Sequence, residues 1–190
     1  MLRGEADPER RRQLAEITAQ AHRAHEMIVD LMLFAKPPAL KRETVDLAAW
    51  LPRTLAPRVE SAHDAGIVWS CNVPALPCPA SIDPTQTLAA LGAVLANSFE
   101  ALAGRGGAID CELTFDDVFA RIRIRDDGPG MDEATRERIF DPFYSGREAG
   151  RGLGFGLCKA WRIVHDHGGE ILVRSSPGQG CETTLIFPRT

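Results

Sequence analysis

The sequence lacks three features that would each point to a class of protein: a long hydrophobic run, a basic block and closely spaced cysteines. No apolar stretch approaches the roughly 20 residues that a membrane-spanning helix needs, and no signal peptide is visible. The net charge of −4 argues against a nucleic-acid-binding protein. We therefore expect a soluble, cytoplasmic chain without membrane contact, whose parent protein could still be anchored upstream.

The cysteines are scattered and show no CxxC spacing, which predicts reduced, mostly buried thiols rather than a disulfide framework. They are Cys71, Cys78, Cys111, Cys158 and Cys181. The composition, with 44% hydrophobic and 25% charged residues in 190, is that of an ordinary globular protein. This length allows one domain of typical size and an appendage.

The appendage is predicted to be one long helix. Between residues 5 and 35 the only Gly or Pro is Pro8, which suits a first helical turn. A heptad seam runs through Leu14, Ile17, Ala21, Ala24, Ile28, Leu31 and Ala35. Such a seam needs another helix, supplied by a second chain, by upstream sequence or by the globular domain. Pro37 and Pro38 end the helix.

The remaining residues, 39–190, read as one globular domain. Strands are predicted at residues 44–47, 67–73, 108–115, 118–125, 170–175 and 181–187. Helices are predicted at 47 to about 65, 84 to about 102, and 158 to about 167. The adjacent strands 108–115 and 118–125 alternate with period two, which indicates an antiparallel hairpin with one buried face. The expected fold is α+β: a two-layer sandwich of a mainly antiparallel sheet with helices on one face.

The helix that starts at Pro84 carries a candidate ligand residue. Its buried face is predicted to contain Leu88, Leu91, Leu95 and Leu102. Asn97 lies on a neighbouring face among small residues such as Ala93. An asparagine alone would be read as a solvated helix residue, but small neighbours leave room for a ligand to approach.

The stretch from Asp126 to Gly156 is rich in glycine. It opens with DDGPGM at 126–131 and closes with GLGFGL at 152–157, with the aromatic patch IFDPFY at 139–144 between them. Glycines this dense let the backbone approach a ligand closely and adopt positive φ angles. The stretch predicts a nucleotide site with a carboxylate at one end and a glycine-rich phosphate lid at the other.

The order of these motifs resembles that in the catalytic domain of sensor histidine kinases of two-component systems. The motifs are, in order, Asn97, DDGPGM, FDPF, GLGFGL and the HGG at 167–169. That domain belongs to an ATPase superfamily shared with gyrase, the Hsp90 chaperones and MutL. The resemblance covers about residue 40 to the C-terminus. The FAKP at 34–37 is similar to the end of the second helix of the dimerisation and histidine-phosphotransfer hairpin. Together, these resemblances imply that residues 1–38 are the second helix of such a hairpin and that residues 39–190 are an ATP-binding catalytic domain.

The resemblance implies that the chain binds ATP and Mg²⁺. Asn97 matches the asparagine that coordinates Mg²⁺, and Asp126 matches the aspartate that accepts a hydrogen bond from the adenine amino group. An ionised carboxylate is acceptor-only, so it suits an amino group and rejects the carbonyl of guanine. Gly128 and Gly130 match the lining of the adenine pocket.

The resemblance also assigns the second glycine motif and its surroundings. Gly152, Gly154, Gly156 and Leu157 match the box whose backbone N–H groups face the triphosphate. Phe140 and Phe143 match an aromatic box that anchors the lid, although core aromatics are an equally good reading. Thr184 matches a strand threonine that supports the adenine-binding carboxylate through water. Arg147 and Arg151 are lid residues that could counter phosphate charge or simply be solvated.

Two departures refine the expected activity. Ala93 occupies the position, four residues before Asn97, where hydrolysing relatives carry a glutamate as general base, so rapid ATP hydrolysis is disfavoured. His22 and His25 flank the helix seam and read as solvated, and His25-Glu26 lacks the proline of the family's phosphoacceptor box. The acceptor histidine is therefore expected upstream of this chain.

The leading hypothesis is a protein-histidine kinase core that works as a homodimer through the N-terminal helix. It would transfer the γ-phosphoryl group of ATP to a histidine outside this chain, for relay to an aspartate of a response-regulator receiver domain. The alternatives are an ATP-hydrolysing conformational switch of the same superfamily and an interaction module without kinase activity.

Overall fold

The computed structural model describes residues 7–144 and 154–189. The chain forms two compact units, Met1–Pro38 and Ala39–Thr190. In the described part of the chain, no helix combines the length and the apolar character that crossing a membrane requires. All five cysteines are free thiols, and three of them are buried.

The first unit contains one helix, α1 (Pro8–Ala35). Its N-terminus is capped by Asp7, whose Oδ1 accepts a hydrogen bond from the backbone N–H of Glu9 at 2.9 Å. The apolar seam is open to solvent: Ile17 is 64% exposed and Ile28 is 56% exposed. A helix with an uncovered seam gains little from packing, which is the main source of helix stability in proteins.

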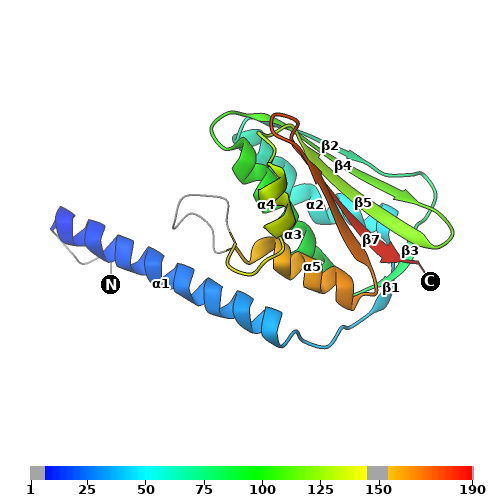
Figure 1. Cartoon of the computed structure of the whole chain (residues 1–190), viewed down its shortest axis with the longest axis horizontal. Coiled ribbons are helices and arrows are strands. Elements are labelled where there is room, and N and C mark those ends of the chain that lie inside the picture. Colours follow the sequence, from blue (N-terminus) through cyan, green and yellow to red (C-terminus); the bar gives the residue numbers. More distant parts are fainter. Residues whose placement is uncertain (1–6, 145–153, 190) are drawn as a thin grey trace. The chain divides into compact units, whose positions relative to one another are not determined.

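The second unit is built on a five-stranded sheet. Its strands are β2 (Ile67–Asn72), β4 (Gly107–Phe115), β5 (Phe119–Asp126), β6 (Glu170–Ser175) and β7 (Cys181–Pro188). Their order across the sheet is β2-β4-β5-β7-β6 (Figure 1). The β2–β4 pair is parallel, and the other three pairs are antiparallel.

Three long helices cover one face of this sheet: α2 (Leu47–Asp64), α3 (Pro84–Leu102) and α5 (Gly156–Asp166) (Figure 1). The hydrophobic core lies between the two layers. Leu91 and Leu95 of α3 are buried there with Ile122 of β5 and Phe187 of β7. The predicted fold class, an α+β sandwich with a mainly antiparallel sheet and helices on one face, is confirmed.

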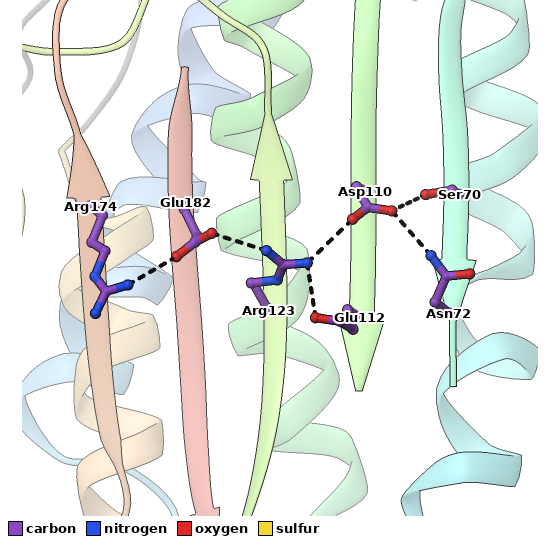
Figure 2. A network of polar contacts seen from close by, with 7 residues as sticks. All are labelled: Ser70, Asn72, Asp110, Glu112, Arg123, Arg174 and Glu182. Carbon is purple, nitrogen blue, oxygen red and sulfur yellow. Dashed lines mark hydrogen bonds and ion pairs between the residues drawn. The ribbon is translucent and has the colours of Figure 1, made fainter. Parts of the chain in front are cut away.

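The opposite face of the sheet carries a ladder of charged side chains (Figure 2). Arg123 on β5 is bound to Glu112 on β4 at 2.8 Å and to Glu182 on β7 at 3.2 Å. Asp110 lies 3.6 Å from the same guanidinium and accepts a hydrogen bond from Ser70 on β2. Opposite charges on neighbouring strands stabilise an antiparallel sheet on its open side.

Two elements were not predicted, and one residue was misplaced. β1 (Glu43–Asp46) pairs with the unpredicted β3 (Pro79–Ile82) in a separate two-stranded sheet. The short helix α4 (Glu133–Arg138) precedes the aromatic patch. Leu88 is 38% exposed, so the prediction that it is buried is wrong.

Candidate functional site

Asp126 is the centre of the candidate site. It ends β5, and it continues the buried stripe of that strand, in which Ala120, Ile122 and Ile124 point to the core. Its side chain is only 3% exposed. The Ser98 hydroxyl on α3 donates to Asp126 Oδ2 at 2.8 Å. The stripe of β5 therefore places a carboxylate under α3.

The other carboxylate oxygen of Asp126 is held by the backbone. Oδ1 accepts hydrogen bonds from the N–H of Gly128 at 3.0 Å and from the N–H of Cys181 at 3.2 Å. A buried charge is tolerated only when such donors replace water. A carboxylate offers about four acceptor positions, so three protein donors leave room for one donor of a ligand.

The glycines that follow Asp126 are required by close backbone packing. Gly130 has φ of +67°, and a Cβ there would overlap the carbonyl oxygens of Ser176 and Gly180. A Cβ on Gly128 would lie 2.7 Å from Asp126 Oδ1. Gly178 N–H donates to the Pro129 carbonyl at 2.7 Å, which ties the loop to the β6–β7 turn. The loop is thereby held in one shape beside the carboxylate.

Asn97, the predicted metal residue, lies on α3, and Gly156 of the second glycine motif lies beside the same helix. Asn97 is half-buried and directly precedes Ser98, the partner of Asp126. One turn earlier, the Ala93 Cβ lies 3.9 Å from the position that a Cβ on Gly156 would take. Gly156 is the first residue of α5. The structure thus brings the start of α5, Asn97 and Asp126 together around one segment of α3.

The start of α5 is suited to an anion. Among the described residues, no side chain makes a capping hydrogen bond to it. The N-terminus of a helix carries a partial positive charge and backbone N–H groups that can bind phosphate. Leu157, also predicted to belong to this box, packs against the hydrophobic core.

The aromatic residues Phe143 and Phe155 contact each other. Phe143 adopts φ of +66°, which is uncommon for a residue other than glycine, and its ring stacks edge-on against Phe155 at 4.7 Å. A Cβ on Gly154 would lie 2.5 Å from the Tyr144 carbonyl oxygen. Phe140 packs against the core. The predicted residues Arg147, Arg151 and Gly152 lie outside the described residues.

The structure does not bring Thr184 to the side of the sheet that carries Asp126. Thr184 pairs with Arg123, and both face the open side of the sheet, whereas Thr183 pairs with Ile124 on the helix side. Thr183 is 4% exposed and shares the face that carries Asp126. A shift of one residue along a strand exchanges the two faces, so the motif match alone could not separate the two threonines.

Sequence reasoning missed two residues that contact Asp126. Ser98 occupies an apolar stripe of α3 formed with Leu91, Leu95 and Leu102, and a polar residue inside such a stripe signals a buried hydrogen bond. Cys181 donates its backbone N–H, for which the sequence has no signal. Burial, together with the nearby Asp126 carboxylate, raises the pKa of the Cys181 thiol to about 11, so the thiol stays protonated.

A hollow of about 420 Å³ lies on the open face of the sheet, away from Asp126. Its charged lining includes Arg123, which is ion-paired with both Glu112 and Glu182 (Figure 2). Within residues 7–144 and 154–189, no three His, Cys, Asp or Glu side chains are grouped to hold a metal ion. We therefore assign the candidate site to Asp126 and α3.

Residues 82–190 match the family described as histidine kinase-, DNA gyrase B- and HSP90-like ATPase. The matched segment contains Asn97, Asp126 and both glycine motifs, and it makes up more than half of the chain. The chain belongs to this ATPase family.

Named relatives in this family are sensor kinases. The chain is 28% identical to the signal transduction histidine-protein kinase AtoS of Escherichia coli (strain K12) over 183 residues, which cover 96% of this chain and 30% of AtoS. It therefore spans less than a third of that relative's length.

Solved structures agree with this fold. The mycobacterial sensor histidine kinase MprB is 25% identical, with a TM-score of 0.65, over 78% of this chain and 97% of that chain. Full-length ShkA, solved in complex with AMPPNP, is 22% identical with a TM-score of 0.82 over 99% of this chain and 41% of that chain.

Proposed function

We propose that this chain is the ATP-binding catalytic core of a sensor histidine kinase. The observation that carries the proposal is the Asp126 carboxylate, which is buried, held by three donors and enclosed by the glycine loop. An acceptor with one open position matches the amino group of adenine. Family membership and the kinase names of the relatives support the same reading.

In this proposal ATP lies between α3 and the start of α5. Asp126 accepts from the adenine amino group, and Gly128 and Gly130 line the base. The N–H groups at Gly154 and Gly156 face the phosphates, where the helix N-terminus favours negative charge. Phosphoryl transfer then depends on positioning and charge stabilisation rather than on covalent chemistry by the protein.

Mg²⁺ fits this arrangement through Asn97. In ATP sites Mg²⁺ takes one or two protein ligands, and phosphate oxygens and waters complete its octahedron. Asn97 is half-buried on α3, one turn after Ala93, and its amide oxygen is the kind of ligand that Mg²⁺ takes. Asn97→Ala should weaken ATP binding in the presence of Mg²⁺ and leave the weaker, metal-free binding unchanged. Equal losses with Mg²⁺ and with EDTA would contradict the assignment.

The phosphoryl acceptor is proposed to be a histidine outside this chain, and the next acceptor an aspartate of a response regulator. We further propose that the parent protein is a homodimer through α1, whose seam is exposed, and that this part of it is cytoplasmic. In the kinase reading, ATP turns over slowly without an acceptor, because Ala93 cannot act as a base.

A transfer assay tests the proposal directly. The chain is mixed with γ-labelled ATP and a separately produced helical hairpin that carries an acceptor histidine. The expected result is an acid-labile label on the hairpin, which is lost when the acceptor histidine is replaced. Rapid steady-state phosphate release without labelling would favour an ATP-hydrolysing switch, and ATP binding with neither activity would favour a binding module.

The adenine assignment has its own test, Asp126→Asn. Asparagine replaces one of the two acceptor oxygens with an NH₂ group. This NH₂ group would face another donor, which is either a protein donor or the amino group of adenine, and the hydrogen bond there is lost. Losing one charge-assisted hydrogen bond costs roughly 1.5–3 kcal/mol, so the Kd for ATP should rise at least about tenfold in a fluorescent-ATP titration. Asp127→Asn is the matched control, because Asp127 is exposed and its Oδ1, which accepts from Ala108 N–H, is retained. Equal affinities in the two variants would exclude Asp126 as the adenine acceptor.

A further inference from the structure

Two cysteines lie side by side on the two parallel strands of the sheet. Cys71 on β2 pairs directly with Cys111 on β4, so both side chains point to the same face. Neighbouring strands are about 4.8 Å apart, which falls inside the Cα–Cα range of about 4.4–6.8 Å found in disulfides. The two thiols also interact with each other through a side-chain hydrogen bond.

The two thiols differ in access and acidity. Cys111 is fully buried, and its pKa is raised by the hydrogen bond with Cys71 and by burial. Cys71 is half-buried on β2, the edge strand of the sheet, and the hydrogen bond from Cys111 lowers its pKa. The thiolate is the nucleophilic form of cysteine, so Cys71 is the more reactive partner.

The thiols of the other three cysteines are less reactive. Burial raises the pKa of Cys78, and burial with the Asp126 charge raises that of Cys181. The Cys158 thiol is buried and donates to the Phe155 carbonyl oxygen at 3.2 Å. Oxidation should therefore be selective for the β2–β4 pair.

We propose that Cys71 and Cys111 are a peroxide-sensitive pair that forms a reversible disulfide between β2 and β4. The Cys71 thiolate attacks one oxygen of hydrogen peroxide, the O–O bond breaks, and hydroxide leaves as the sulfenic acid of Cys71 forms. The Cys111 sulfur then attacks the sulfenic sulfur, the S–O bond breaks, and the Cys111 proton goes to the departing hydroxide. One peroxide is reduced to two waters while two thiols become one disulfide.

The position of the pair determines what the bond does. β2 is the edge strand of the sheet and pairs with β4, which carries Cys111. Once formed, the bond fixes this edge strand to the sheet and restricts the unfolded chain. The buried Cys111 also removes the sulfenic acid before peroxide can oxidise it further. This inference does not depend on nucleotide binding.

Peptide mapping of the peroxide-treated chain tests the proposal. The whole chain is exposed to low hydrogen peroxide, unfolded with an alkylating reagent and analysed by mass spectrometry. The expected product is a Cys71–Cys111 cross-linked peptide that lacks two hydrogen atoms, with Cys78, Cys158 and Cys181 alkylated. Dithiothreitol should reverse it, and the thermal unfolding midpoint should be higher before reversal. Recovery of Cys71 and Cys111 as alkylated thiols at peroxide levels that oxidise the other cysteines would overturn the proposal.

Variants assign the roles of the two thiols. In Cys111→Ser, the sulfenic acid of Cys71 should persist and react with a dimedone probe, whereas in Cys71→Ser the Cys111 thiol should survive treatment. Cys78→Ser is the control, because it removes a buried cysteine and should leave the cross-link unchanged. Loss of the Cys111 thiol at the wild-type rate in Cys71→Ser would contradict the order of steps. If a variant fails to fold, the mapping of the wild-type chain still decides the outcome.

Discussion

The hydrogen bond between Ser98 and Asp126 joins two polar residues that each occupy an apolar stripe. Ser98 replaces an apolar residue on the buried face of α3, and Asp126 does the same at the end of β5. Each group would be costly to bury alone, and their 2.8 Å contact makes both tolerable. At the scale of single residues, the candidate site is therefore a place where two polar side chains interrupt the apolar core and bond to each other.

Ser98→Ala should weaken ATP binding without unfolding the chain. It removes one of three donors to a buried carboxylate, a hydrogen bond to a charged group worth roughly 1.5–3 kcal/mol. We expect the Kd for ATP to rise about tenfold by isothermal titration calorimetry. The control is Thr184→Ala on the open face of the sheet, which should keep the wild-type Kd. The same Kd in both variants would show that Ser98 does not hold the adenine acceptor.

At the scale of elements, a buried histidine links the end of α5 to the start of α3. His167 Nε2 accepts from the Asp83 N–H at 2.9 Å, and its Nδ1 lies 2.7 Å from the Ile163 carbonyl oxygen. This pattern requires the neutral ring with the proton on Nδ1. Burial, reinforced by Arg42, lowers the pKa of His167 below its ordinary value of 6.5, although contact with Ile163, Asp83 and Asp166 opposes this.

The stability of the chain should therefore fall as the pH drops below 6.5. In that range the unfolded chain binds a proton at His167 that the folded chain does not. The contribution of His167 to the free energy of unfolding is therefore complete above pH 6.5 and is lost as the pH falls below it. His167→Gln should flatten the pH dependence of the unfolding free energy by up to about 1.4 kcal/mol per pH unit. Urea unfolding between pH 7.5 and pH 5 measures this. The control is the exposed His165→Gln, and an equal change of slope in both variants would refute the prediction.

The elements that could be predicted from the sequence are those with a local signal. The β4–β5 hairpin follows from two alternating runs and a polar turn, and α3 from an Asp-Pro start with an apolar stripe. β3 was missed because its identity as a strand depends on pairing with β1, which lies far away in the sequence. α4 has six mostly polar residues and no apolar period, so only its N-cap Asp132 marks it.

The positions of candidate site residues were predictable where a local pattern marks them. Asp126 ends an alternating strand, as expected, and Gly130 in the loop after it has φ of +67°. The choice between Thr183 and Thr184 depends on strand register, which the sequence fixes only through the pairing of β5 with β7. The backbone donor of Cys181 depends on the same pairing, so no side-chain motif could reveal it.

At the scale of the whole molecule, the two units have different sources of stability. The unit Ala39–Thr190 holds the complete hydrophobic core, from Leu47 to Phe187, together with Asp126 and Ser98. The unit Met1–Pro38 offers a 28-residue helix whose seam is exposed. A core of its own allows the larger unit to fold by itself, whereas α1 needs another helix to cover its seam.

Negative charge placed in the seam of α1 should therefore weaken the self-association of the chain and leave its affinity for ATP unchanged. In the double variant Ile17→Asp/Ile28→Asp, each carboxylate would be buried against a partner helix without a counter-charge, so self-association should weaken at least tenfold in sedimentation velocity across a concentration series. Ala19→Glu is the matched control, because residue 19 is exposed and lies opposite the seam. ATP affinity should be the same in all three proteins, since the larger unit carries the site. If the double variant dimerises as tightly as the wild type, the dimer interface lies elsewhere. If the wild-type chain stays monomeric at every concentration, α1 does not form a dimer interface in this chain.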